Sequence, residues 1–195
     1  MSSRTLLLTL YTKREQGTRS RFGVPKRGIV TARWAFGWLG WILLFQAQAY
    51  ASETLHGRVV RIADGDTLTV LDDSRVQHRV RLAGIDAPER AQAFGNRSRQ
   101  SLGFLVMNKY VVVEYGKSDR YGRIVGKVLV ARSDANLAQI QAGMAWHYKE
   151  YQREQTPHDV KAYAEAEAQA REKRAGLWAD KDPIPPWSFR KAKRN

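Results

Sequence analysis

The sequence contains no cysteine among its 195 residues. Disulfide bonds, thiolate metal sites and a cysteine nucleophile are therefore excluded. Long apolar runs are also lacking, because the run from Trp34 to Phe45 is about a dozen residues and a membrane-spanning helix needs roughly 20. No internal repeat is visible. A chain of this length can bury enough surface to fold without covalent cross-links.

Acidic residues are scarce, since 19 Asp and Glu stand against 33 Lys and Arg, for a net charge of +14. Residues 1–51 hold eight of the basic residues and one acidic residue, Glu15, which leaves +7 on the remainder. This excess favours a polyanionic partner, either nucleic acid or an anionic membrane surface. Charge alone does not choose between the two.

The first 51 residues follow the order of a secretory signal peptide. Basic residues come first, the apolar run to Phe45 follows, and small residues alternate with larger ones up to Ala51. We expect cleavage after Ala49 or Ala51 and an exported domain, secreted or periplasmic. The alternative is an uncleaved anchor that holds the domain outside the cytoplasm. The basic stretch is long for a signal peptide, and a true translation start near Val24 or Val30 would explain it.

The remainder is dominated by short β-prone segments with turn residues between them. We expect five strands, at residues 55–62, 67–71, 76–83, 110–115 and 123–130. We expect three helices, at residues 98–107, at residues 135–142, and from a cap at Thr156 to Arg174, where Gly176 ends the helix. Five strands with a helix between the third and the fourth predict an α+β fold, a five-stranded OB-type Greek-key β-barrel with about three packed helices.

The boundaries follow from composition. Residues 52–182 form the folded domain, and residues 183–195 form a proline-rich, basic tail. We expect Pro183–Trp187 to be non-helical and to lie across the surface, and Arg190–Arg194 to fray. The basic end either attracts phosphate non-specifically or serves only solubility.

Three polar clusters lie where the expected strands end, at Asp64–Thr67, Arg81–Glu89 and Asp119–Arg123. Each cluster by itself is typical of an ordinary turn or a solvated strand face. Together they provide carboxylates for a hard divalent cation, arginines for bidentate contact with phosphate, and a further carboxylate to take a proton from water. This combination is sufficient for metal-assisted hydrolysis of a phosphodiester.

The same three clusters, in this order and spacing, resemble the thermonuclease (staphylococcal-nuclease-like) family over about residues 55–180. The resemblance implies an OB barrel with three helices and a nuclease that cuts DNA or RNA, single strands and frayed duplex preferred, into 3′-phosphorylated fragments. It implies calcium held by the carboxylates of Asp66 and Asp86 and the backbone carbonyl of Ala87. Arg81 and Arg123 would bind phosphate, and Glu89 would be the general base.

Substrate contacts beyond these are also implied by the resemblance. Tyr121 would pack near the nucleotide with Arg120 beside it. Tyr148 and Tyr151 either stack on bases or are ordinary surface aromatics. Two departures weaken the match, since position 87 is alanine where the best-known members have threonine, and residues 90–98 form a shorter segment than their lysine-rich loop.

Two other classes of protein fit parts of the sequence. One is an OB-fold module that binds single strands without cutting them, and the other is an interaction protein tethered to the membrane by its N-terminal segment. Glu89 and both arginines are present, which favours the enzyme. No obligate protein partner is implied, and membrane contact would come only through an uncleaved N-terminal segment.

Overall fold

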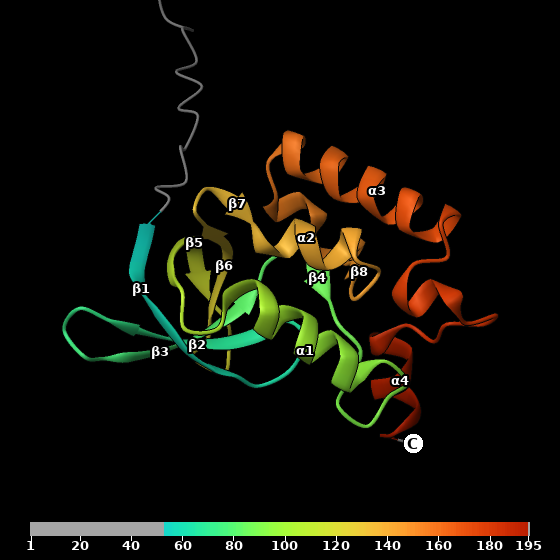
Figure 1. Cartoon of the computed structure of the whole chain (residues 1–195), viewed down its shortest axis with the longest axis horizontal. Helices are drawn as coiled ribbons and strands as arrows, with labels where there is room; N and C mark the ends of the chain where they lie inside the picture. The colour runs from blue at the N-terminus through green and yellow to red at the C-terminus, as the bar shows by residue number, and fades with distance from the viewer. Residues whose placement is uncertain (1–52, 195) are drawn as a thin grey trace, which may run out of the picture. The chain divides into compact units, whose positions relative to one another are not determined.

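The computed structural model describes residues 53–194, and the expected export segment, residues 1–51, lies outside them. None of the helices in this part of the chain has both the length and the hydropathy that a membrane span requires. Figure 1 shows the strands of the barrel on one side and most of the helices on the other.

The barrel is built from five strands that form one continuous sheet. In sheet order they are β3 (Gln77–Leu82), β2 (Thr67–Asp72), β1 (Glu53–Ile62), β5 (Tyr110–Ser118) and β6 (Ile124–Val130). Parallel pairing of β3 with β6, in which Val80 lies opposite Ile124, closes the sheet on itself. The short strand β7 (Ser133–Asp134) pairs antiparallel with the end of β6. The expected OB-type barrel is confirmed.

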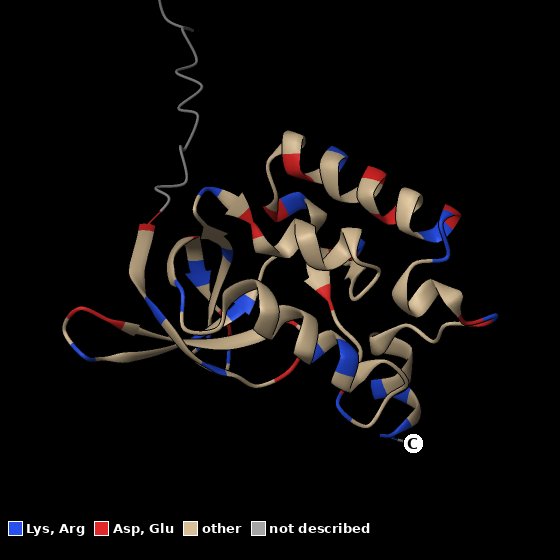
Figure 2. Ribbon diagram, in the orientation of Figure 1, with Lys and Arg blue, Asp and Glu red and all other residues tan. Residues whose placement is uncertain are grey.

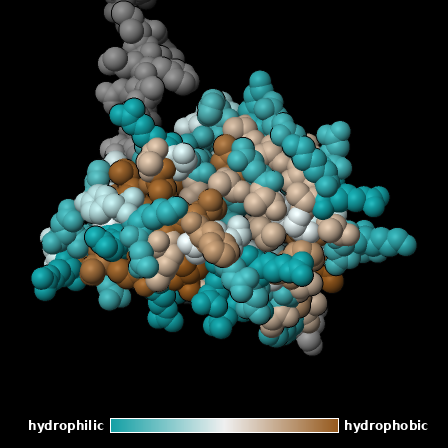
Figure 3. All heavy atoms as spheres, in the orientation of Figure 1, coloured by the Kyte–Doolittle hydropathy of each residue, from teal (hydrophilic) through white to brown (hydrophobic). Residues whose placement is uncertain are grey.

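The interior of the barrel is filled by alternating residues of these strands. In β1 the buried residues Leu55, Gly57 and Val59 alternate with exposed ones, and Val111 and Val113 are buried in β5. Each fully buried aliphatic side chain of this kind contributes about 1.5–3 kcal/mol to folding. On the face drawn in Figure 3, hydrophilic residues surround the rim and hydrophobic ones gather over the strands.

Three helices lie where the sequence predicts them: α1 (Gly95–Val106), α2 (Ala135–Gln141) and α3 (Pro157–Glu172). The expected cap of α3 is present, because Thr156 Oγ1 accepts the N–H of Asp159 at 3.1 Å. Helix α1 begins three residues earlier than expected. Its first residue follows Phe94, whose left-handed backbone (φ 66°) sets the direction in which the helix starts.

A second, two-stranded sheet joins distant parts of the chain. Strand β4 (Ile85–Asp86) pairs with β8 (Trp146–His147), and the N–H of Tyr148 donates to the carbonyl of Gly84 at 2.9 Å. The 3₁₀ helix η1 (Lys149–Glu154) follows directly. These pairings place Tyr148 beside Asp86. Strands of two residues carry no periodic pattern, and the sequence therefore did not predict them.

The C-terminal segment corrects one expectation. After the 3₁₀ helix η2 (Gly176–Ala179), helix α4 spans Pro186–Ala192. The expectation that Pro183–Trp187 is non-helical is wrong from Pro186 onward, because proline fits the first turn of a helix, where no N–H donor is needed. The expectation of fraying is wrong for Arg190 and the rest of α4.

Candidate active site

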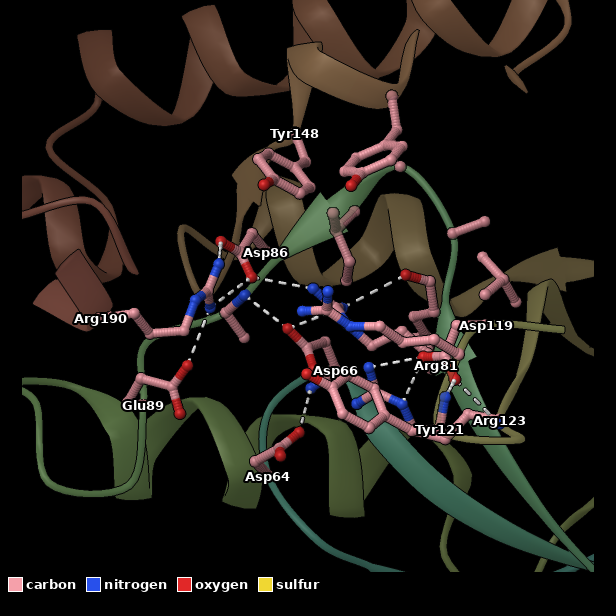
Figure 4. Close-up of a pocket in the computed structure, with 18 of the residues that line it drawn as sticks. Asp64, Asp66, Arg81, Asp86, Glu89, Asp119, Tyr121, Arg123, Tyr148 and Arg190 are labelled. Atoms are coloured by element: carbon pink, nitrogen blue, oxygen red, sulfur yellow. Dashed lines mark hydrogen bonds and ion pairs between the residues drawn. The ribbon is translucent and has the colours of Figure 1, made fainter. Parts of the chain in front are cut away.

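One open pocket of about 950 Å³ lies at the end of the barrel where β3, β4, the β5–β6 turn, η1 and α4 meet. All ten site residues expected from the sequence line it (Figure 4): Asp66, Arg81, Asp86, Ala87, Glu89, Arg120, Tyr121, Arg123, Tyr148 and Tyr151. Residues from four separate segments of the chain therefore share one cavity.

Two buried carboxylates form the centre of the site. Asp66 precedes β2, and Asp86 belongs to β4. Arg81 of β3 bridges them, with Nη1 2.7 Å from Asp66 Oδ2 and Nη2 2.8 Å from Asp86 Oδ1. Because the guanidinium is rigid and planar, these two contacts hold the carboxylates at a defined separation.

The turn before β2 holds Asp66 in place through backbone contacts. The N–H of Ala87 donates to Asp66 Oδ2 at 2.7 Å, and the N–H of Asp66 donates to Asp64 Oδ1 at 3.1 Å. Gly65 packs so closely against α1 that an added Cβ would overlap the hydroxyl of Ser98. Glycine is therefore required at this point for the turn to approach the helix.

Negative charge is concentrated here. Burial and the charge of Asp66 raise the pKa of Asp64 to about 7. Burial also raises the pKa of Asp86, although Arg190 and Arg81 act in the opposite direction. Burial thus disfavours the charged forms of Asp64 and Asp86, and the contacts from Arg81 and Arg190 partly offset this effect at Asp86.

The donor set agrees in kind with a hard divalent cation. Among residues 53–194 no group of three or more His, Asp or Glu side chains is arranged to hold a metal ion. The expected set uses only two such side chains, Asp66 and Asp86, together with the backbone carbonyl of Ala87. All three donors are oxygens, which calcium prefers, and a backbone donor does not depend on the side chain at position 87.

Arg123 lies on another wall of the pocket, where Asp119 holds it. Asp119 Oδ2 accepts from Nε and lies 2.7 Å from both Nε and Nη2 of Arg123. Its Oδ1 accepts the N–H groups of Tyr121 and Arg123, and Gly122 takes a left-handed conformation (φ 71°) that closes the turn. Although burial opposes it, the bonds from Arg123 lower the pKa of Asp119, which therefore stays ionised.

Aromatic side chains lie beside these charged groups. Tyr121 is 64% exposed, with the guanidinium carbons of Arg120 and Arg123 at 4.9 and 5.5 Å from its ring centre. The rings of Tyr148 and Tyr151 are 5.1 Å apart. Burial and the neighbouring Glu150 raise the pKa of Tyr148 to about 12, which keeps its hydroxyl protonated at neutral pH.

Sequence reasoning missed one side chain at the centre of the site. Arg190 of α4 contacts both Asp86 and Glu89 (Figure 4), and Lys193 and Arg194 line the same pocket. The basic tail was visible in the sequence. No spacing rule, however, connects Arg190 with carboxylates that lie about a hundred residues earlier.

A closed OB-type barrel that carries a bridged carboxylate pair and arginines in one open pocket has the groups that metal-assisted hydrolysis of a phosphodiester requires, the reaction of a nuclease. Nucleases are hydrolases that act on the ester bonds of nucleic acid.

Comparisons with known proteins identify the family. A family model described as staphylococcal nuclease homologue matches residues 79–180. A micrococcal nuclease of Shigella flexneri is 42% identical over 163 residues, which cover 79% of this chain and 90% of that protein. An uncharacterized endonuclease of Haemophilus influenzae is 43% identical over 137 residues, which cover 70% and 74%. The chain belongs to the staphylococcal nuclease family and is a nuclease.

Proposed function

We propose that the protein is an exported, calcium-dependent endonuclease that hydrolyses DNA or RNA and leaves 3′-phosphates. The observation that carries this proposal is the bridge of Arg81 between Asp66 and Asp86, with Glu89 and Arg123 in the same pocket. Oxygen donors for a cation and guanidinium groups for an anion then lie side by side.

The two arginines bind the phosphate that is attacked. Asp119 takes up Nε and Nη2 of Arg123, and the bonds described for residues 53–194 leave its Nη1 available for a phosphate oxygen. Arg81 is held in the same way by two carboxylates. Guanidinium groups held beforehand lose little entropy when they bind the negative charge that develops on the phosphate oxygens.

Glu89 takes the proton of the attacking water. Its side chain is 38% exposed at the pocket, where water reaches it. A bound calcium ion, held by Asp66, Asp86 and the carbonyl of Ala87, supplies positive charge beside the phosphate. As the water oxygen attacks phosphorus in line and gives its proton to Glu89, the bond from phosphorus to the 5′ oxygen breaks. Solvent water protonates the leaving 5′ oxygen, which departs as a hydroxyl, and the phosphate stays on the 3′ side.

The aromatic side chains of the pocket favour a substrate with accessible bases, and Tyr121 and Tyr151 are exposed. Tyr121, Tyr148 and Tyr151 line the pocket together with Arg120. Bases stack on such rings only when they are unpaired, and we therefore propose single strands and frayed duplex as the preferred substrates.

A cleavage assay tests the activity. The full chain is incubated with denatured DNA, with calcium or with a chelator, and the product ends are tested for phosphatase-sensitive 3′-phosphate. We expect cleavage only with calcium, and a loss of at least about a hundredfold in Glu89→Gln, since removal of one interaction made in the transition state costs about two or more decades. Calcium-independent cleavage, or an active Glu89→Gln, would contradict the proposal.

Fractionation of cells, with N-terminal sequencing of the product, tests export and anchoring.

A further inference from the structure

Helix α4 brings a third arginine into the active site. Arg190 Nη2 lies 2.8 Å from Asp86 Oδ2, and its Nη1 lies 3.2 Å from Asp86 Oδ1 and 2.8 Å from Glu89 Oε1. The guanidinium of an arginine stays charged at any relevant pH. Arg190 is therefore a permanent cation next to the carboxylate that we assign as the base.

The position of α4 depends on aromatic packing. Trp187 stacks on Tyr148, with ring centres 5.5 Å apart and planes inclined by 14°, and meets Trp146 edge-on at 5.5 Å. Pro186 at the start of the helix is buried. The Nε2 of Gln92 donates to the carbonyl of Ile184 just before it. The helix is thus a wall of the pocket.

The basic side chains of α4 and the chain end determine whether basic or acidic side chains are in excess in the pocket. Six carboxylates line the pocket: Asp64, Asp66, Asp86, Glu89, Asp119 and Glu154. Seven basic side chains line it: Arg81, Lys117, Arg120, Arg123, Arg190, Lys193 and Arg194. Without the three from the C-terminal segment, acidic groups would outnumber basic ones six to four. Figure 2 shows the cluster of basic residues that α4 and the chain end form.

We propose that α4 and the two residues after it form a phosphate-binding arm for the sugar–phosphate backbone of the nucleic-acid strand. Arg190 binds the phosphate next to Glu89, and Lys193 and Arg194 bind the phosphates beyond it. Asp86 and Glu89 balance the charge of Arg190 before a strand arrives. This inference rests on the proposed function.

Binding measurements without cleavage test the arm. Anisotropy of a labelled, single-stranded oligonucleotide is followed over a range of salt concentrations with a chelator present, for the full chain and its variants. We expect Arg190→Gln to weaken binding about tenfold at low salt, as loss of a charged hydrogen bond implies. We expect the slope of log K against log salt to fall by about 0.7 for each phosphate contact that is lost.

Two further variants keep the test decisive. The double variant Lys193→Gln with Arg194→Gln removes two charges that form no bond with Asp86 or Glu89. If Arg190→Gln does not fold, the double variant still tests whether this segment binds the strand. We expect the double variant also to bind more weakly and with a smaller slope. Arg58→Gln is the matched control, since Arg58 is exposed on β1 and lies outside the pocket.

The proposal of a phosphate-binding arm is overturned if a folded Arg190→Gln keeps the affinity and the salt slope of the parent. It is also overturned if the double variant keeps them, or if Arg58→Gln loses as much affinity as Arg190→Gln. Tighter strand binding in Arg190→Gln would show instead that the arginine blocks the site, and would also overturn it. The calcium assay described above is independent, because it can fail while these binding differences remain, and the reverse also holds.

Discussion

At the scale of single residues, the arginines of the pocket differ in the carboxylates that hold them. Arg81 lies between Asp66 and Asp86, and its side chain is 15% exposed. Among the carboxylates of residues 53–194, only Asp119 holds Arg123, at 2.7 Å and on the same turn. Removal of Arg81 would leave two buried carboxylates without their common partner. Removal of Arg123 would affect only the surface turn that contains Asp119. Arg123 is therefore the better probe of catalysis.

We expect Arg123→Ala to lose about two to three decades in kcat, because it removes a donor to the phosphate in the transition state. Its melting temperature should stay close to that of the parent. Single-turnover cleavage of denatured DNA with saturating calcium measures the effect, with Arg58→Ala as the control. Near-parental turnover would show that Arg123 does not bind the reacting phosphate.

At the scale of elements, an ion pair joins helix α3 to the barrel. Lys127 Nζ of β6 lies 2.6 Å from Asp159 Oδ2, and the N–H of Asp159 donates to the Thr156 hydroxyl. Burial alone would raise the pKa of Asp159, but the hydrogen bond and charge of Lys127 outweigh it and lower the pKa. The folded state therefore favours the charged form of Asp159. This contribution to stability is present above the usual pKa of aspartate and is lost as the pH falls through the lower, folded-state pKa.

We expect Asp159→Asn to lower the free energy of unfolding by about 1–2 kcal/mol at pH 7, the range for a hydrogen bond to a charged group. The difference in the free energy of unfolding between this variant and the parent should shrink as the pH falls below about 4, the ordinary pKa of aspartate. Urea unfolding between pH 3 and pH 7 measures it. Glu165→Gln, an exposed residue on the same helix, is the control and should change little. A difference that stays constant down to the acid limit would exclude the ion pair as its source.

At the scale of the whole molecule, buried amides on α2 hold the barrel and the turns around the site together. Asn136 Nδ2 donates to the carbonyls of Ala83 and Gly126, and its Oδ1 accepts the N–H of Val128. Gln139 Nε2 donates to the carbonyl of Gly65 in the turn before Asp66. Both amides are fully buried, and Gly65, Gly126 and Val128, whose backbone groups they bind, are buried as well.

We expect Asn136→Ala to destabilise the fold by about 2–4 kcal/mol, because it leaves buried backbone groups without partners. Denaturant unfolding with an unchanged m-value measures the loss. Gln141→Ala, at an exposed position on the same helix, should stay within about 0.5 kcal/mol of the parent. Equal stability of the two variants would show that Asn136 does not join these segments.

Alternation and capping predicted most of the elements correctly. The buried positions of β1 and β6 alternate with more exposed ones, as a half-buried strand requires, and the cap at Thr156 marked the start of α3. The residue types of the site were also predictable, since the three clusters together supply ligands for a cation and for phosphate, although each alone is typical of an ordinary turn. The pairing of β4 with β8 was not, because it depends on contact between segments about sixty residues apart.

The sequence by itself determined the class of chemistry: hard oxygen donors and arginines, no thiols, and strand ends that place Asp66, Arg81 and Arg123 near one another. Only the tertiary structure decided that Arg190 joins them. Its contact with Asp86 requires Trp187 to pack on Tyr148, and Tyr148 is placed by the β4–β8 pairing. Packing between segments far apart in the chain leaves no local sequence pattern. For this reason the sequence predicted a frayed tail, whereas in the structure this segment forms a wall of the active site.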